Sequence, residues 1–281
     1  MRSSHTIAII CIALTACGSV PSQSDANARR ERLVDLNDSG QRAVARGELR
    51  RAAAHYTEAL RLAETIEDFR AVAVNALNLA ATWQALNEIE LCERALDKLL
   101  VSPTRFEPRF VAEAEGRKAL LALQASRLDA AREWLGRAES GCRAPECRIQ
   151  TALLNLRGQL MLEQGAGGEA RILFARALTA SRSEGNREEE ANALRLDGRA
   201  AARMGEHAQA AGLLNQALEI DKQLALPDKI AQDLLALAET ELARGQRAAA
   251  VDYAQRAYDV SRAAGNQRQQ DAAKRVMERM P

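Results

Sequence analysis

The strongest constraint on the fold is a pattern of small residues that repeats along almost the whole chain of 281 residues. Its members are 39 or 40 residues apart: Gly40, Ala80, Ala119, Gly158, Gly198 and Ala238. Seven positions after each comes a residue suited to a tight turn: Gly47, Asn87, Ser126, Gly165, Gly205 and Gly245. A long period with a turn residue at a fixed offset predicts a stack of similar helical hairpins.

Two more positions of the repeating unit describe how its helices pack. Five residues after each turn stands another small residue: Ala52, Cys92, Ala131, Ala170, Ala210 and Ala250. Four residues later the side chain is mostly larger: Tyr56, Leu96, Leu135, Phe174 and Leu214, with Ala254 as the exception. Helical periodicity continues on both sides of each turn. The pattern therefore predicts two antiparallel helices that cross closely where their side chains are small.

The repeat resembles the tetratricopeptide repeat from about Leu33 to Met280, although its unit is longer than the roughly 34 residues usual in that family. The resemblance implies an all-α, right-handed superhelix, or α-solenoid, with six repeats over residues 29–265. Residues 266–281 carry one apolar stripe with Ala273, Val276 and Met277, which predicts a capping helix. The resemblance also implies that the first helix of each repeat lines a concave surface that binds a protein or peptide.

The amino terminus has the pattern of an export signal, because Arg2 precedes a short apolar stretch from Ile7 to Leu14. The sequence Leu14-Thr15-Ala16-Cys17 resembles the lipobox of bacterial lipoproteins. This resemblance implies a signal peptide over residues 1–16, cleavage before Cys17 and attachment of a lipid to its sulfur. Residues 18–28 are small and polar, so residues 17–28 are expected to form a lipidated, flexible tether.

The residue that follows the lipidated cysteine bears on the destination of the protein. Gly18 stands where an aspartate retains enterobacterial lipoproteins in the inner membrane, which implies an outer-membrane lipoprotein facing the periplasm, with inner-membrane retention as the alternative.

Cys142 and Cys147 enclose four residues at an expected turn between repeats. A disulfide is predicted there, since nearby cysteines pair in an oxidising compartment. Free thiols and a metal site are the alternatives, and no histidine is near in sequence.

The sequence lacks the motifs expected of an enzyme or a nucleic-acid-binding protein. Without residues 1–16, 38 basic residues balance 38 acidic ones, because only Arg2 is lost from the 39 lysines and arginines. A neutral chain gives no electrostatic reason to expect nucleic-acid binding. No nucleophile motif, metal-ligand spacing or cofactor motif is present, so no cofactor is expected. The run Glu188–Glu190 is interpreted as a solvated helix start.

The candidate binding surface lies on the first helices of the fourth and fifth repeats. Polar residues spaced by three or four positions fall on one stripe of each helix: Asn155, Gln159, Asn192, Arg195, Arg199 and Arg203. Three guanidinium groups in a groove would bind an acidic peptide or a terminal carboxylate. The alternative is a ladder of ion pairs between repeats, because Glu163 precedes Arg203 by 40 residues and Glu239 follows Arg199 by 40.

These features predict a lipid-anchored periplasmic scaffold that mediates protein–protein interactions during envelope assembly, in pilus, secretion or cell-wall machinery. One alternative is a regulator of the long-repeat type, which would require a cytoplasmic location. Another is a cell-wall hydrolase, which would require a carboxylate pair or a nucleophile and base that the sequence does not display.

Overall fold

The computed structural model describes residues 23–142 and 147–279, and within these ranges the only regular secondary structure is helical. The α-helices are α1 (Gln23–Ala45), α2 (Leu49–Thr65), α3 (Phe69–Ala85), α4 (Ile89–Leu100), α5 (Pro108–Gln124), α6 (Leu128–Gly141), α7 (Gln150–Glu163), α8 (Gly167–Glu184), α9 (Arg187–Arg203), α10 (His207–Gln223), α11 (Pro227–Ala243), α12 (Arg247–Ala263) and α13 (Gln267–Glu278). A 3-10 turn, η1 (Pro103–Arg105), joins α4 to α5.

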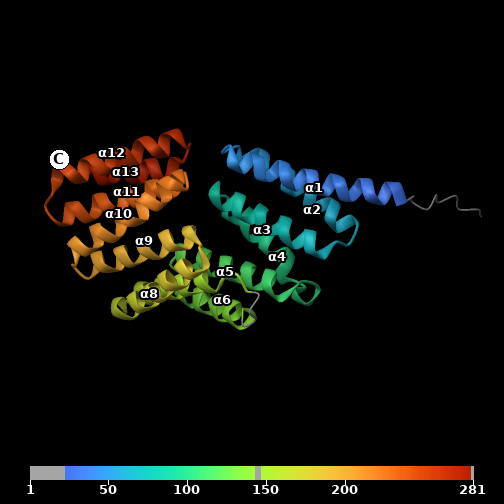
Figure 1. Cartoon of the computed structure of the whole chain (residues 1–281), viewed down its shortest axis with the longest axis horizontal. Coiled ribbons are helices and arrows are strands. Elements are labelled where there is room, and N and C mark those ends of the chain that lie inside the picture. Colours follow the sequence, from blue (N-terminus) through green and yellow to red (C-terminus); the bar gives the residue numbers. More distant parts are fainter. Residues whose placement is uncertain (1–22, 143–146, 280–281) are drawn as a thin grey trace, which may run out of the picture.

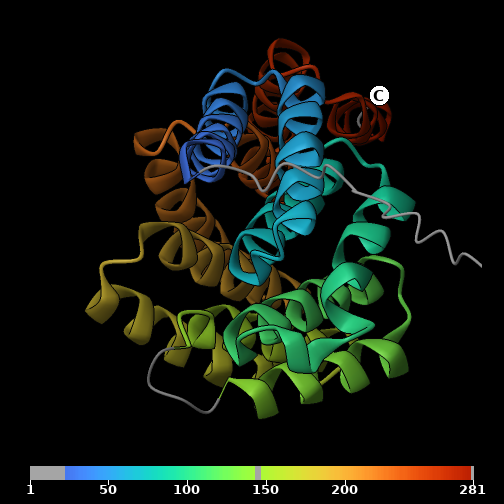
Figure 2. The same ribbon diagram turned by 90° about the vertical axis from the view of Figure 1, so that its right-hand side faces the viewer.

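The first twelve α-helices form six consecutive hairpins, and α13 follows the last of them. Figure 1 shows the hairpins following one another along an arc, with α5, α6 and α8 at its base and the first and last helices at its two ends. In the perpendicular view of Figure 2, α1 in blue and α13 in red again lie on the side opposite the green helices. This architecture confirms the predicted all-α superhelix of helix-turn-helix repeats with a terminal helix.

The six turns within the hairpins occur at the residues that the sequence pattern indicated. All six have positive φ angles: Gly47, Asn87, Ser126, Gly165, Gly205 and Gly245. Asn87 (φ 60°) and Ser126 (φ 56°) adopt the left-handed conformation although they carry side chains. A chain reversal over so few residues needs this conformation, which glycine reaches at the lowest cost.

The small residues of the first helices make room for the larger residues of the second helices. A Cβ atom added to Gly40 would lie 2.5 Å from Cε1 of Tyr56, and one added to Gly198 would lie 2.8 Å from Cγ of Leu214. Tyr56 and Leu214 are both buried. The paired helices therefore approach closely because the small and large residues are complementary, as the repeat pattern predicts.

Polar side chains start three of the helices that follow the turns between repeats. Asp68 accepts a hydrogen bond from the backbone N–H of Ala71 at the start of α3, at 2.9 Å. Asn186 and Asn266 do the same for α9 and α13. Pro108 and Pro227 occupy first positions of helices, where no backbone N–H is required. The helices that follow these turns therefore begin at residues suited to a helix start.

Helix α13 closes the carboxyl-terminal end of the stack. Its Ala273 and Val276 are buried against α11 and α12. Its Gln269 donates a hydrogen bond to the backbone oxygen of Asp228, at 2.9 Å. The opposite side of α13, with Lys274 and Arg275, is exposed. An amphipathic helix of this kind covers the apolar end of the sixth hairpin and presents polar groups to water.

The amino-terminal predictions lie partly outside the described residues. Residues 1–22, which contain the expected signal peptide and Cys17, belong to that part. Helix α1 begins at Gln23, so residues 23–28 of the expected tether are helical. Extending an existing helix costs much less free energy than starting one, and α1 is anchored farther along by packing on α2. None of the helices in the described part of the chain is long and apolar enough to cross a membrane.

Candidate functional site on the concave surface

The first helices of successive repeats pack against one another. Contacts join α3 to α5, α5 to α7, α7 to α9 and α9 to α11, whereas the second helices make their principal contacts with first helices. Helices on the inner side of an arc lie closer together than those on its outer side. The first helices therefore line the concave surface, as the resemblance implied.

Arg195, which was predicted to bind a ligand, is instead buried between three helices. Its Nε donates to Oδ1 of Asp233 on α11 at 2.6 Å, and its Nη2 donates to Oδ2 of Asp221 on α10. The side chains of Arg195, Asp221 and Asp233 are 5%, 1% and 0% exposed. The prediction for Arg195 was wrong, because its guanidinium is committed to two carboxylates of its own chain and does not reach the groove.

The two carboxylates that share Arg195 have unequal surroundings. Burial raises the pKa of Asp233 to about 7, although the Arg195 charge acts in the opposite direction. The neighbouring Asp221 carboxylate adds to the rise. Oδ2 of Asp233 is buried and has no hydrogen-bond partner among the described residues. The single positive charge of Arg195 therefore compensates only part of the cost of burying two carboxylates.

Arg203 follows the alternative interpretation, the ion-pair ladder between repeats. Its Nη2 lies 2.8 Å from Oε1 of Glu163 on α7, and its Nη1 donates to the backbone oxygen of Leu162 at 3.3 Å. The second expected rung is absent, because Arg199 makes no ion pair with Glu239 or with any other residue in the described ranges. The structure thus contains one of the two predicted rungs.

Arg199 remains the arginine of the stripe that can meet a ligand. Its side chain reaches solvent inside the concavity. The surrounding protein and the nearby Arg203 charge lower its pKa. Arg199, Arg203, His207 and Glu239 line a cavity of about 290 Å³ between α9 and α11. A guanidinium in this position can donate hydrogen bonds to a carboxylate.

The three predicted amide residues of the stripe also differ in burial and in their hydrogen bonds. Asn155 is buried and donates to Oε2 of Glu189 at 2.7 Å, and Asn192 donates to the same oxygen at 3.2 Å. Gln159 is half-buried. The prediction of Asn155 as a groove residue was therefore wrong, since its amide joins α7 to α9.

The glutamates at the start of α9 are also more structural than predicted. Glu190 is buried, and its carboxylate pairs with Arg187 at 2.5 Å and with Arg182 at 3.0 Å. Burial opposes ionisation of Glu190, but its hydrogen bonds to Arg182 and Arg187 and their charges lower its pKa. The interpretation of this run as a solvated helix start was wrong for Glu190, and Glu189 bonds to two amides as described above.

Polar bonds between first helices are the feature that the sequence analysis missed. Asn37 donates to Oδ1 of Asn75 at 3.0 Å, and the bond from Arg195 to Asp233 spans the same 38 residues. Asn75 and Asp233 both stand five residues before the small residue of their repeat, where three other repeats have Ala114, Leu153 and Ala193. The first repeat has Asp35 there, and a polar residue at a position that is apolar in the other three repeats was the signal that could have identified these bonds.

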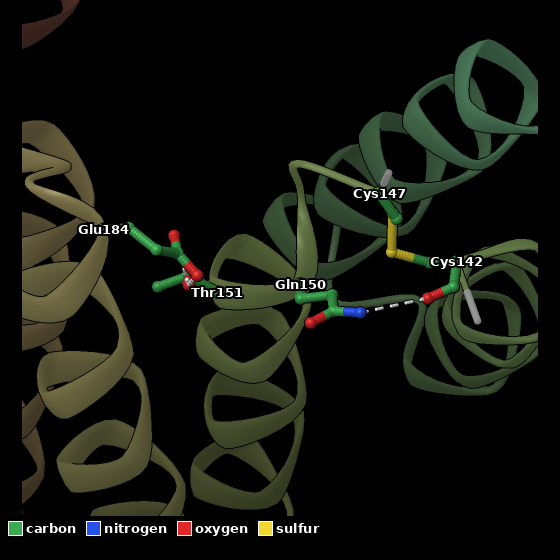
Figure 3. Close-up of a disulfide and its surroundings, with 5 residues drawn as sticks. All are labelled: Cys142, Cys147, Gln150, Thr151 and Glu184. Atoms are coloured by element: carbon green, nitrogen blue, oxygen red, sulfur yellow. Dashed lines mark hydrogen bonds between the residues drawn. A yellow bond between two sulfur atoms is a disulfide. The ribbon is translucent and has the colours of Figure 1, made fainter. Parts of the chain in front are cut away.

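A disulfide joins Cys142, at the end of α6, to Cys147, just before α7 (Figure 3). Their Cα atoms are 5.2 Å apart, within the range that a disulfide spans. Gln150 donates to the backbone oxygen of Cys142 at 3.5 Å. Residues 143–146 lie outside the described part. No group of three or more potential metal ligands occurs among the described residues.

Cys92 differs from these two cysteines. It is buried at the small-residue position of α4, and no disulfide partner lies near it in the described part of the chain. Burial raises the pKa of its thiol to about 11. A neutral, enclosed thiol reacts slowly, so Cys92 is a packing residue, as its place in the repeat predicts.

Comparison with known proteins agrees with this architecture. Residues 148–223, which include α7 to α10, match the sequence profile of the tetratricopeptide repeat. Residues 148–223 thus carry the tetratricopeptide repeat, and the helical hairpins before and after them continue the same fold. Among curated protein sequences, none matches this chain.

Several solved structures share the fold at low sequence identity. A Rap protein complexed with Competence and Sporulation Factor is 14% identical, with a TM-score of 0.63, over 92% of this chain and 79% of that one. The APC/C hetero-tetramer Cut9–Hcn1 is 16% identical, with a TM-score of 0.64, over 90% of this chain and 44% of that one. PilW, a widely conserved type IV pilus biogenesis factor, is 16% identical, with a TM-score of 0.55, over 85% of this chain and 96% of that one.

Proposed function

We propose that this protein is a lipid-anchored scaffold that faces the periplasm and holds a protein or peptide partner of envelope-assembly machinery in its concave surface. The observation that carries the proposal is the inner wall of first helices with an open cavity at Arg199. Repeat scaffolds of this kind bind extended or helical segments along such a wall. PilW, a pilus biogenesis factor with a similar fold, is consistent with an envelope role.

The cellular address rests on the amino-terminal sequence. Leu14-Thr15-Ala16-Cys17 supports lipid attachment at Cys17, and Gly18 supports transfer to the outer membrane. Labelled palmitate should be incorporated into the wild-type protein and not into a Cys17→Ala variant, which should accumulate as an unprocessed precursor. Equal labelling of the two proteins would refute the anchor.

Partner binding is tested by crosslinking intact cells and purifying the full-length protein from the membrane fraction. The captured proteins should be envelope components. A control variant with substitutions only on the second helices, which lie on the outer side of the arc, should capture the same proteins as the wild type. The absence of any specifically crosslinked protein would contradict the scaffold role.

The alternative is a regulator of the long-repeat type that binds a signalling peptide in the cytoplasm. The similar fold of the Rap protein bound to Competence and Sporulation Factor favours keeping this alternative. The palmitate experiment separates the two functions, because a cytoplasmic regulator carries no lipid at Cys17. Fractionation of the wild-type protein into the cytosol would support the regulator.

A further inference from the structure

A column of arginines runs along the amino-terminal half of the concave surface. Arg30, Arg70, Arg109 and Arg148 occupy the same position in four successive repeats, ten residues before the small residue of the first helix. In the fifth and sixth repeats this position is acidic, with Glu188 and Asp228. The basic column therefore extends over repeats one to four and then reverses its sign.

Three of these arginines meet in one cavity of about 260 Å³. Arg70 comes from the first turn of α3, Arg109 from the first turn of α5, and Arg148 from the segment just before α7. Apolar side chains of Val74, Phe110 and Ile149 complete much of the wall. The cavity thus combines three guanidinium groups with apolar surface from three consecutive repeats.

The charges of this cavity are poorly compensated by the protein itself. Among its described lining residues the one acidic side chain, Glu113, pairs with Arg117 at 3.1 Å. Arg109 lies 4.7 Å above the Phe110 ring and pairs with the half-exposed Glu107 at 2.7 Å. Nε of Arg109 is buried and unbonded within the described ranges. Partly exposed pairs such as Arg109–Glu107 contribute little stability, so a ligand carboxylate can replace Glu107.

Neither Arg70 nor Arg148 makes an ion pair with a residue that the structure describes, and both side chains are exposed. We propose that this cavity, hereafter the three-arginine site, binds an extended peptide with acidic side chains at every third position and apolar side chains between them. Packed helices lie about 8–10 Å apart. A polyproline II segment brings every third side chain to the same face at intervals of roughly 9 Å.

This match of spacings lets successive carboxylates reach successive arginines. Each guanidinium can bind a carboxylate through two parallel hydrogen bonds, which lysine cannot do. The intervening apolar side chains then face Val74, Phe110 and Ile149. The acidic residues Glu188 and Asp228 repel an acidic segment that continues into the fifth repeat, so the acidic part of the ligand ends at the fourth.

Fluorescence anisotropy with three labelled nonapeptides tests this site on the folded, full-length protein at low salt. The probes are (Glu-Pro-Leu)3, (Gln-Pro-Leu)3, which lacks the charges, and (Glu-Pro-Gly)3, which lacks the apolar side chains. We expect (Glu-Pro-Leu)3 to bind at least tenfold more tightly than either of the others, and its Kd to rise with salt. Equal binding of the three peptides, or no binding of the first, would overturn the proposal.

Matched variants locate the binding. Arg70→Gln with Arg148→Gln should raise the Kd of (Glu-Pro-Leu)3 by tenfold or more. Arg94→Gln with Arg176→Gln removes the same charge from exposed positions of the second helices α4 and α8, and should change the Kd by less than twofold. Equal losses in the two double variants would show that only net charge matters and would refute the site.

The three-arginine site deepens the proposed function and rests on it, so the crosslinking experiment should be repeated with both double variants. Capture by the wild type and by the control, but not by Arg70→Gln with Arg148→Gln, supports the site. Undiminished capture by that variant refutes the site and leaves the scaffold function standing. Absence of capture by the wild type contradicts the scaffold function itself, whatever the peptide binding shows.

Discussion

The Phe174 ring on α8 occupies the space that a side chain on Gly158 of α7 would need. A Cβ atom added to Gly158 would lie 2.3 Å from Cε1 of Phe174, a ring that is completely buried. The ring cannot move aside without displacing its buried neighbours, because packing in such a core is dense. The close packing of α7 on α8 therefore requires a residue without a Cβ atom at position 158.

We expect Gly158→Ala to lower the free energy of unfolding by about 1–3 kcal/mol, as overpacking of a core typically does. Gly136→Ala is the control, because Gly136 lies within α6 and nothing would contact its added Cβ within 4 Å. That change should stabilise the protein by up to about 1 kcal/mol through helix propensity. Urea unfolding measures both, and equal effects of the two changes would contradict the close crossing.

Stability should depend on pH through Asp233. Its pKa is raised to about 7 in the folded protein from an ordinary value of 3.8. Between these values the folded state binds the additional proton, so the free energy of unfolding falls as pH rises from about 4 to 7 and then levels off. The slope contributed by this one group is about 1.4 kcal/mol per pH unit at most.

Asp233→Asn should remove that component of the pH dependence. The asparagine oxygen can still accept from Arg195, while its amide can donate towards Asp221 as a protonated carboxyl would. The variant should thus be at least as stable as the wild type at pH 8. The measurement is the difference between the two unfolding curves at pH 5 and pH 8, and parallel pH profiles would exclude the assignment.

Arg195 and Arg203 lie on the same helix but should differ greatly in their effect on stability. Arg195→Met leaves two buried carboxylates without their cation, which should cost about 3–5 kcal/mol. Arg203→Gln breaks a half-exposed ion pair with Glu163, and should cost less than about 1 kcal/mol. Thermal unfolding compares them, and a small effect of Arg195→Met would show that its buried network is not formed.

The cysteines should differ in their reactivity towards an alkylating reagent. In protein purified from its native host without reduction, Cys142 and Cys147 should be found in one linked peptide by mass spectrometry. Cys92 should be alkylated only after unfolding, because its thiol is buried and its pKa is about 11. Rapid labelling of Cys142 and Cys147 in the native protein would contradict the disulfide.

The fold was largely predictable because its determinants are local and repeated. Gly165 and its equivalents mark turns, and Gly158 with Phe174 marks a helix crossing, so each position was indicated six times. The site was predicted less well. Arg195 and Arg199 have the same side chain and differ by one helical turn, yet one is buried against two carboxylates and the other reaches solvent. Periodicity identifies the helix face but not which partners a neighbouring repeat supplies.

The three-arginine site was missed for a related reason. The predicted binding residues lie farther along the first helices, whereas Arg70, Arg109 and Arg148 lie at or before the helix starts. Their common position in the repeat was present in the sequence. Their convergence on one cavity depends on how three helix starts are brought side by side, and this follows only from the curvature of the stack.

The disulfide described above has a mechanical consequence. Each helix contacts mainly its neighbours in the chain, so a pull between the two ends passes through every junction in series. A relaxed connection of five peptide units can stretch to about 17 Å, whereas the bond holds Cys142 and Cys147 at 5.2 Å. The bond removes this slack between the third and fourth hairpins. A load across this junction is therefore carried by the covalent bond, and α7 cannot separate from α6 by straightening of the chain between them.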